Sequence, residues 1–416
     1  MEKLRIGLIG LGTVGSGVYK SAQEFDNIEI VKIAVRDINK PRAVDAPLEI
    51  LTNNPYDVIN DPSIDVVVEL MGGVEPAWDY IKTALKNGKH IVTANKELLA
   101  KKGEELFNLS EECNRVVLYE AAIAGGIPII MPIKTIMAGN KIRRIQAILN
   151  GTTNYILTKM DVDGASYEEV LKEAQTLGYA ESDPTGDVEG FDAAYKITTL
   201  ATIAFNSRTK FENVYREGIT KIRKEDMQKA NELGYKIKLI ASATIDENRN
   251  ADVRVHPMLV PKNSMLAHID YVTNAVAICG HPIGNILLSG PGAGEFPTAS
   301  SVMGDILAIA REWGTTDYLL PMMRCHHHSI SNPVKIEDTY NKYYLSITAP
   351  NGIGLIAKIG AICAGKNINL SSILSDSDET TARITVITDK CLEKSIKDVV
   401  TELDDCIVNS LIRVME

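Results

Sequence analysis

A glycine-rich loop near the amino terminus constrains the fold of this chain more than any other feature. An apolar stretch from Leu4 to Ile9 runs directly into Gly10-Leu11-Gly12-Thr13-Val14-Gly15, and a helical stretch follows. Gly10 permits a tight turn, Gly12 lets the backbone approach a pyrophosphate, and Gly15 allows close packing of helix on strand. The helix that follows begins with free N–H groups facing the phosphates. Because the motif lies between a strand and a helix, it predicts a dinucleotide site rather than a ligand-free glycine turn.

The rest of the first third of the chain continues the alternation of strand and helix. A helix is expected from Pro76 to Asn87, with proline in its first turn and Gly88 just past its end. Strands are expected at residues 28–35, 64–70, 91–94 and 116–119. This order predicts an α/β fold, a doubly wound parallel sheet of the Rossmann type, in residues 1–135.

The pattern changes near Pro128, and two further domains are expected, within the two to four that a chain of 416 residues allows. Residues 136–325 mix long strands with helices and predict an α+β domain, while the helix near residues 300–320 is expected to return to the first domain. Residues 343–416 follow the order strand, helix, strand, strand, helix, strand, which predicts a small ferredoxin-like domain.

Composition excludes several classes of function. Lys and Arg number 44 against 54 Asp and Glu, a net charge of −10 that argues against binding nucleic acid. The six cysteines form no C-x-x-C pair, which is typical of reduced thiols in a cytoplasmic protein. The uncharged run from Tyr271 to Gly294 contains Gly280 and Pro282 and predicts two buried strands, not a membrane span. The run His326–His328 lacks a partner motif for a metal and is interpreted as polar surface.

The end of the second strand bears on the choice of cofactor. An acidic residue at this point holds the ribose 2′-hydroxyl of NAD, whereas an arginine accommodates the 2′-phosphate of NADP. The chain carries both, as Arg36 and Asp37, with Lys40 and Arg42 close behind. The basic residues favour NADP, while NAD, and a solvated loop that binds neither, stay open.

An acid-rich segment lies between Gly178 and Lys196. Five acidic residues fall within it: Glu181, Asp183, Asp187, Glu189 and Asp192. The segment does not match a calcium loop, because the glycine and the ligand positions are out of order.

The helix expected from Phe191 to Phe205 has only two charges, Asp192 and Lys196, which share one face because they are four residues apart. A helix that is apolar nearly all round is buried, and lone buried charges are costly. The pair is therefore either a structural ion pair or part of a substrate site, with a carboxylate and a proton donor.

Two further segments follow strands of the first sheet. Lys96, in Thr93-Ala94-Asn95-Lys96, comes at the carboxyl end of a strand, where open α/β sheets bind ligands. Glu120 begins the run E-A-A-I-A-G-G-I, whose carboxylate and turned carbonyls suit a hard cation. On the residues alone, this run is equally well explained as a hinge between domains.

These segments together resemble the homoserine dehydrogenase family. The resemblance rests on G-L-I-G-L-G-T-V-G, T-A-N-K, L-N-G-T-T-N-Y-I-L, G-Y-A-E-S-D-P-T-G-D-V-E-G-F-D-A-A-Y-K and G-P-G-A-G-E-F-P-T-A-S-S-V, in that order, and spans essentially the whole chain. Residues 343–416 resemble an ACT domain. With no kinase segment before the glycine loop, the chain resembles the family's monofunctional form.

The resemblance implies an NAD(P)-dependent oxidoreductase acting on a CH–OH group. It would interconvert L-aspartate 4-semialdehyde and L-homoserine, on the route to threonine, methionine and isoleucine, as a homodimer or tetramer formed through the middle domain. The implied cofactor residues are Leu11, Thr13, Val14, Lys96, Gly178 and Gly292; Glu181 and Asp192, with Asp187 beside them, would bind the substrate. Lys196 matches the family's proton donor, with Lys96 as the second candidate. Glu120, Ile123, Gly125 and Ile127 match its sodium site, the last three through backbone carbonyls.

Two other functions remain open on the sequence: another NAD(P) enzyme acting on a small aldehyde or sugar, and an amino-acid sensor without activity. The first should lack the acid-rich segment, and the second would gain nothing from a buried Asp192–Lys196 pair. The resemblance makes threonine the leading effector at the ACT domain. Its first turn departs from the usual pattern at Asn351 and Ile353, so a dimerisation module without ligand is the alternative.

Overall fold

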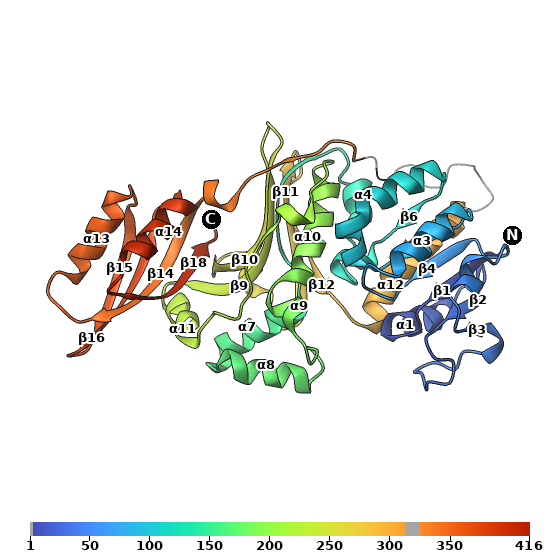
Figure 1. Cartoon of the computed structure of the whole chain (residues 1–416), viewed down its shortest axis with the longest axis horizontal. Helices are drawn as coiled ribbons and strands as arrows, with labels where there is room; N and C mark the ends of the chain where they lie inside the picture. Colours follow the sequence, from blue (N-terminus) through green and yellow to red (C-terminus); the bar gives the residue numbers. More distant parts are fainter. Residues whose placement is uncertain (1–2, 313–324, 326) are drawn as a thin grey trace.

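The computed structural model describes residues 3–312, 325 and 327–416, and it is elongated, with three parts arranged in a row (Figure 1). The amino-terminal parallel sheet lies at one end, a mixed sheet with its helices occupies the middle, and the carboxyl-terminal domain lies at the other end.

The first sheet confirms the predicted Rossmann-type class. Its strand order is β3-β2-β1-β4-β5-β6, and every pairing is parallel. The strands are β1 (Leu4–Ile9), β2 (Ile28–Ala34), β3 (Leu51–Thr52), β4 (Val66–Glu69), β5 (His90–Thr93) and β6 (Val117–Leu118). The helices joined to them are α1 (Thr13–Ala22), α2 (Tyr56–Ile59), α3 (Ala77–Lys86) and α4 (Lys96–Glu112). From β1 the sheet grows outward in one direction through β2 and β3, and in the opposite direction through β4, β5 and β6. The point between β1 and β4 where this order switches is where open α/β sheets bind dinucleotides.

A late helix packs against the first domain. Helix α12 (Glu295–Glu312) lies on α1 (Figure 1). A side chain added at Gly17 would meet the Glu295 carbonyl oxygen at 2.7 Å, so only glycine allows this close approach. The Lys20 Nζ and Glu295 Oε1 atoms, 2.7 Å apart, join the same two helices.

The middle domain is built on a mixed sheet with helices beside it. Its main strands are β7 (Lys141–Ile148), β9 (Tyr235–Ile245), β10 (Asn250–Pro261), β11 (Thr273–His281) and β12 (Gly284–Pro291). The uncharged run forms the two predicted strands, paired as the hairpin of β11 and β12. The prediction that both are buried is wrong for β12, whose residues are all half-buried or exposed because it is the edge strand of the sheet. The helices include the short α5 (Ala121–Ala124) and α6 (Ile130–Lys134), then α7 (Gly151–Asp163), α8 (Tyr167–Thr176), α9 (Thr185–Val188), α10 (Phe191–Ala204) and α11 (Lys224–Glu232). In the part of the chain that is described, no helix is long and apolar enough to cross a membrane.

The carboxyl-terminal domain has the predicted ferredoxin-like order. It comprises β14 (Tyr340–Pro350), α13 (Leu355–Gly365), β15 (Leu370–Ser377), β16 (Thr381–Thr388), β17 (Cys391–Leu392), α14 (Glu393–Glu402) and β18 (Ile407–Val414). Strand β18 pairs in parallel with β10, matching Met258 with Arg413 and Leu259 with Val414. The middle and terminal sheets are therefore one continuous sheet, ordered β12-β11-β7-β9-β10-β18-β14-β16-β15.

The interpretation of the three adjacent histidines as polar surface is wrong for one of them. His327 is buried, and its Nδ1 lies 2.9 Å from Asn206 Oδ1. His328 is exposed, and His326 lies outside the described residues. A short-range pattern could not reveal this burial, because the partner of His327 is more than a hundred residues away.

Candidate active site

The first two turns of α10 carry the two charges that the sequence singled out. Gly190 caps the helix in the left-handed region, at φ 77°, and Asp192 and Lys196 follow one turn apart. Only 7% of the Asp192 side chain and 9% of the Lys196 side chain are exposed. The Lys196 Nζ lies 2.6 Å from Asp192 Oδ2 and donates to the Leu149 carbonyl at 2.8 Å. Both charges therefore have partners in the interior.

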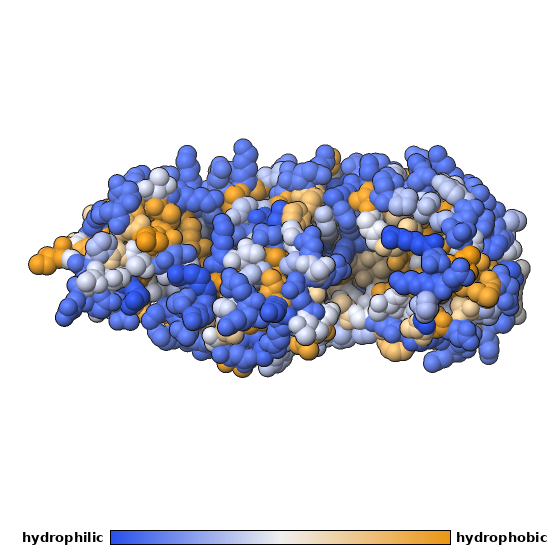
Figure 2. All heavy atoms as spheres, turned by 60° about the horizontal axis from the view of Figure 1, so that its bottom comes forward, coloured by the Kyte–Doolittle hydropathy of each residue, from blue (hydrophilic) through white to orange (hydrophobic). Residues whose placement is uncertain are grey.

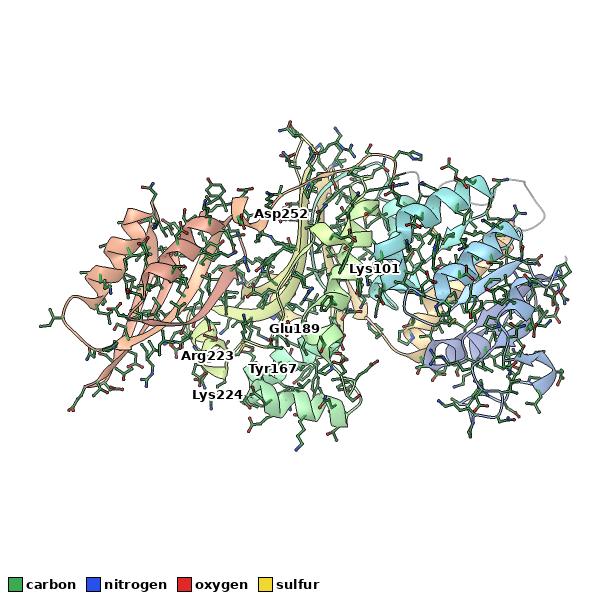
Figure 3. The ribbon with its side chains drawn as sticks, viewed as in Figure 1. Lys101, Tyr167, Glu189, Arg223, Lys224 and Asp252 are labelled. Carbon is green, nitrogen blue, oxygen red and sulfur yellow. The ribbon has the colours of Figure 1, made fainter. Side chains whose placement is uncertain are left out.

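Lys96 reaches the same carboxylate from the first domain. It begins α4, which packs against α10, and its Nζ lies 2.5 Å from Asp192 Oδ1. Its side chain remains 44% exposed, so it faces an open space while Asp192 is buried. Farther along α4, the Lys101 ammonium lies 5.4 Å from the centre of the Tyr195 ring of α10, at the same contact between domains (Figure 3). One carboxylate is thus shared by ammonium groups from two domains.

Burial and charge give the two lysines different acidities. Burial lowers the pKa of Lys196, and the charge of Lys96 lowers it further, against the opposing effect of Asp192. The Asp192 carboxylate raises the pKa of Lys96. Burial alone would raise the pKa of Asp192, but the two ammonium groups hold it well below its usual range. Of the two lysines, Lys196 gives up its proton more readily.

The acid-rich segment divides between the site and other parts of the fold. Burial, and then the charge of Asp192, raise the pKa of Asp187, which is held near the site by a hydrogen bond. Glu181 is exposed, and its charge contributes to raising the pKa of Lys96. Asp183 accepts from the Thr185 N–H at 3.1 Å, while Glu189 accepts from the Thr220 hydroxyl at 3.1 Å, on the side away from α4 (Figure 3).

Asn150 belongs to this site, although the sequence reasoning did not single it out. Its Nδ2 donates to Asp187 Oδ1 at 2.6 Å and to Asp192 Oδ2 at 3.0 Å. Its Oδ1 accepts from the Thr153 N–H at 2.8 Å and so caps α7. An asparagine immediately before a helix is a recognisable capping signal, and it was available in L-N-G-T-T-N. The contacts with two distant carboxylates were not.

An open cavity of about 910 Å³ lies over the carboxyl ends of β1 and β2. Gly10, at φ 107°, passes close to Leu70, and a side chain at Gly15 would lie 2.3 Å from the Gly10 carbonyl oxygen, so both glycines are required by packing. Gly12 caps α1 and has open space around it. The predicted cofactor residues among those that line the cavity are Gly10, Leu11, Gly12, Thr13 and Arg36.

The basic residues at this cavity differ in their contacts. Arg42 donates to the carbonyls of Ile38 at 3.0 Å and Lys40 at 2.8 Å, so it braces the loop. Asp37 also lines the cavity, and its Oδ1 accepts from the Asn39 N–H at 2.9 Å. Arg36 is exposed.

Several predicted cofactor residues do not line this cavity. They are Val14, Gly15, Lys96, Gly178 and Gly292. Gly178 follows the end of α8 and is exposed. Gly292 instead marks a crossing of chains, because a side chain added at Gly125 would lie 2.2 Å from the Gly292 carbonyl oxygen.

Glu120 lies buried beside this crossing. Its oxygens accept from the N–H groups of Ile130 at 2.8 Å and Met131 at 2.7 Å, at the start of α6. The backbone N–H of Glu120 donates to Asp305 of α12 at 2.8 Å, and Ser301 of the same helix donates to the Gly125 carbonyl at 2.6 Å. The described residues contain no group of three or more His, Cys, Asp or Glu side chains able to hold a metal ion.

Comparisons with known proteins agree along the whole chain. Family models match residues 10–120 (homoserine dehydrogenase, NAD-binding domain), 128–307 (homoserine dehydrogenase) and 343–408 (ACT domain). The homoserine dehydrogenase of Neisseria gonorrhoeae is 39% identical over 98% of this chain and 97% of its own length. That of Bacillus subtilis is 38% identical over 97% of this chain and 96% of its own length.

Solved structures give the same result. The crystal structure of a homoserine dehydrogenase from Thiobacillus denitrificans is similar with a TM-score of 0.94 and 38% identity, covering 100% of this chain and 99% of that one. A hyperthermophilic archaeal homoserine dehydrogenase in complex with NADPH is similar with a TM-score of 0.64 and 27% identity, covering 75% of this chain and 98% of that one.

Proposed function

The chain belongs to the homoserine dehydrogenase family, an oxidoreductase family of amino-acid biosynthesis, and we propose that the Asp192–Lys196–Lys96 cluster is its reaction centre. The enzyme interconverts L-aspartate 4-semialdehyde and L-homoserine with a nicotinamide cofactor. The observation that supports the proposed centre is the sharing of one buried carboxylate by two lysines from different domains. The nicotinamide, when bound, supplies or accepts the hydride.

In the proposed mechanism Lys196 handles the proton. When the aldehyde is reduced, Lys196 gives a proton to the oxygen that becomes the homoserine hydroxyl; when homoserine is oxidised, it takes that proton back. Because burial lowers the pKa of Lys196, it gives up its proton more readily than an exposed lysine, as a proton donor that must also act as acceptor requires. Lys96, with its raised pKa, remains charged and stabilises negative charge at the same oxygen.

The acidic residues bind the amino acid. The substrate carries an ammonium group, and Glu181, Asp187 and Asp192 supply negative charge on the side facing Lys96. Asn150 holds Asp187 and Asp192 in place through its bridging amide. Gly10, Leu11, Gly12 and Thr13, which line the cavity, would hold a nicotinamide dinucleotide there, and the free N–H groups at the start of α1 would bind its phosphates.

The test is steady-state kinetics with homoserine and NADP. Lys196→Ala should lose a factor of about 100 or more in turnover while retaining cofactor binding, because it removes the general acid. Lys96→Ala should lose less turnover and raise the KM for homoserine. Near-normal turnover in Lys196→Ala, with a large loss of turnover in Lys96→Ala, would assign the role of proton donor to Lys96 instead.

The cofactor is proposed to be NADP in preference to NAD. Arg36 and Asp37, the residues that would favour NADP and NAD respectively, both line the cavity after β2. Lys40 lines the same side of the cavity and adds positive charge.

A sodium ion is proposed at Glu120 with the carbonyls of Ile123, Gly125 and Ile127. Burial raises the pKa of both Glu120 and Asp305, and the charge of Glu120 adds to the effect on Asp305, with Lys134 opposing it. A cation at this point would offset the cost of two buried carboxylates, and oxygen donors suit a hard ion. The ion would stiffen the crossing at Gly125. Thermal unfolding in sodium chloride against choline chloride tests it, and Glu120→Gln should abolish the difference.

The ACT domain is proposed to bind an amino-acid effector, with threonine as first candidate, in a homodimer or tetramer. Gly354, at φ 90°, caps α13 and leaves its N-terminus open for a carboxylate. Figure 2 shows apolar side chains gathered at this end of the molecule; Ile353, Ile356 and Leu374 are exposed there, which favours pairing of two copies. Calorimetry with threonine, methionine and isoleucine tests binding. The six free cysteines favour a cytoplasmic, reducing location.

A further inference from the structure

A buried carboxylate lies at the junction of the cofactor cavity and the segment that carries Lys96. Glu69 ends β4, and its relative exposure is 0%. No ammonium or guanidinium group of the described residues lies within ion-pair distance of it, and burial raises its pKa. An unpaired buried carboxyl is costly, so its presence at the switch point of the sheet calls for an explanation.

Neutral donors from two segments satisfy this carboxylate. Glu69 Oε1 accepts from the Met71 N–H at 2.7 Å, and Oε2 accepts from the Thr93 hydroxyl at 2.6 Å. The N–H of Gly72 and the amide of Asn95 also interact favourably with it. Glu69 therefore joins the end of β4 to the end of β5.

The first of these segments forms a wall of the cofactor cavity. Leu70 and Met71 line the cavity, and a side chain added at Gly10 would meet the Leu70 carbonyl oxygen at 3.0 Å. Gly72 and Gly73 then take left-handed conformations, at φ 79° and 75°. The Met71 N–H bond to Glu69 holds the beginning of this turn.

The second segment leads directly to Lys96. The Thr93 hydroxyl, which donates to Glu69, accepts from the Asn95 N–H at 3.0 Å. Asn95 caps α4 through Leu98 at 3.1 Å and donates to the Gly73 carbonyl at 2.6 Å, closing the connection between the segments. Lys96 is the next residue, and its ammonium meets Asp192.

A buried charge at the amino ends of the strands of the same sheet, opposite to the ends where Glu69 lies, provides a comparison. Lys89, 4% exposed, precedes β5 and donates to the carbonyls of Asp61 and, at 2.7 Å, Ile64. These contacts involve neither the cavity nor Lys96. Lys89 is therefore an example of a buried charge with a purely structural role in this domain. Glu69 differs from Lys89 because it lies between two parts of the site.

We propose that Glu69 is a positioning residue: its carboxylate holds the Leu70–Gly73 wall and the Thr93–Lys96 segment in one arrangement, so that Lys96 meets Asp192 beside the bound cofactor. The proposal rests on the roles assigned above to Lys96 and to the cavity.

Three variants separate the two connections. In Glu69→Gln, the amide oxygen can still accept from Met71, but the amide nitrogen replaces the acceptor for the Thr93 hydroxyl. Thr93→Val removes the same hydroxyl from the other side. Both should lower kcat/KM for homoserine by about tenfold or more, since small displacements of a reacting group are costly, with NADPH affinity nearly unchanged. Glu69→Ala loses both connections and should also weaken NADPH binding, measured by cofactor fluorescence.

Lys89→Met is the matched control. It should lower the unfolding temperature and leave the kinetic constants of the folded enzyme unchanged. Glu69→Gln and Thr93→Val with wild-type kcat/KM, or with a loss no larger than that of Lys89→Met at equal unfolding temperature, would overturn the proposal. If Lys96→Ala itself is fully active, the role of Lys96 fails separately. The proposal is then decided by Glu69→Ala, and unchanged NADPH affinity overturns it.

Discussion

At the scale of single residues, one buried carboxylate is shared by two lysines. Asp192 contacts Lys196 on its own helix and Lys96 on a helix of another domain, at 2.6 and 2.5 Å. Because burial acts against the charge of Lys196 while Lys96 stays partly exposed, two residues of the same type have pKa values shifted in opposite directions. Their environments, rather than their residue type, are the basis of the different roles proposed for the two lysines.

The pH dependence of the reaction should report the pKa of Lys196. In the proposed mechanism Lys196 must be neutral when homoserine is oxidised, so this rate should rise with pH through a pKa below the value of about 10.4 for a free lysine. Aldehyde reduction needs the protonated form and should fall over the same range. Asp192→Asn removes the negative charge that raises the pKa of Lys196, so the rise in the oxidation rate should move to lower pH, together with a loss of rate. If the rise in rate stays at the same pH in Asp192→Asn, the pH dependence belongs to a group other than Lys196.

Arg36 should distinguish the two cofactors. Arg36→Ala should raise the KM for NADP by about tenfold or more and leave that for NAD unchanged, because only NADP offers a phosphate to the guanidinium. Arg5→Ala is the matched control, since Arg5 pairs with Glu29 at 3.2 Å and does not line the cavity. Equal effects on both cofactors, or none on NADP, would contradict the assignment.

At the scale of elements, the site depends on where helices begin. Helices α4, α7 and α10 all present their first residues to it: Lys96, Asn150 as the cap, and Asp192. A helix start is defined by its cap, so these residues are placed more precisely than loop residues. The short α9 and the loop before it bring Asp187 to the same point.

The cap of α7 should therefore affect both stability and binding. Asn150→Ala should cost about 1 kcal/mol through the lost cap. It also removes a hydrogen bond that favours the ionised form of Asp187, so the pKa of Asp187 should rise further. The KM for homoserine should therefore rise, and the increase should be largest at low pH. Ser166→Ala, which removes the capping box of α8 away from the site, should match the loss of stability without the change in KM. Equal KM values in the two variants would refute the binding role.

At the scale of the whole molecule, the ACT domain extends the middle sheet instead of hanging from a linker. Arg413 of β18 contacts Glu393 Oε1 at 2.5 Å and Glu217 Oε2 at 2.9 Å, the latter in the middle domain. The neighbouring Arg216 donates to the Glu189 carbonyl at 2.7 Å and lies 3.4 Å from the Phe191 ring centre, at the start of α10. Close contacts thus connect the ACT domain with α10, which carries Asp192 and Lys196.

Breaking this junction should destabilise the enzyme. Arg413→Met leaves Glu393 buried without its main partner and should cost about 3–5 kcal/mol at neutral pH. Burial alone would raise the pKa of Glu393, but Arg413 lowers it. The ion pair therefore stabilises the fold fully at pH values above the unfolded pKa of about 4.3, and this stabilisation is lost as pH falls from there through the lower folded pKa. Chemical denaturation at pH 7 and pH 4 should show the difference shrinking. Equal midpoints at pH 7 would refute it, whereas Arg413→Met with Glu393→Leu should recover stability.

Removing the ACT domain should not yield a well-behaved enzyme. A chain ending at Ile336 loses β18 and exposes the edge of β10 at Met258 and Leu259. Because an exposed strand edge can pair with another chain, this chain should aggregate. Light scattering should detect this association. A monodisperse, active truncated chain would show that β18 is dispensable, and its insensitivity to threonine would then locate the effector site.

Local features of the sequence were sufficient for much of this structure. The glycine loop, the strand–helix alternation, the capping box at Ser166 and the spacing of Asp192 and Lys196 each depend on residues within a few positions of one another. The periodicity of side chains, the free groups at helix ends and the freedom of glycine act over such short distances. The fold class and the charged face of α10 therefore followed from the sequence.

Only the tertiary structure decided which distant residues meet. The contact of Lys96 with Asp192, the bridge made by Asn150, the burial of His327 and Glu69, and the pairing of β18 with β10 each join segments far apart along the chain. None has a local signature, because a buried polar group is explained by its partner, and packing of whole elements selects that partner. For the same reason the shared carboxylate, on which the proposed chemistry depends, became visible only once α4 lay against α10.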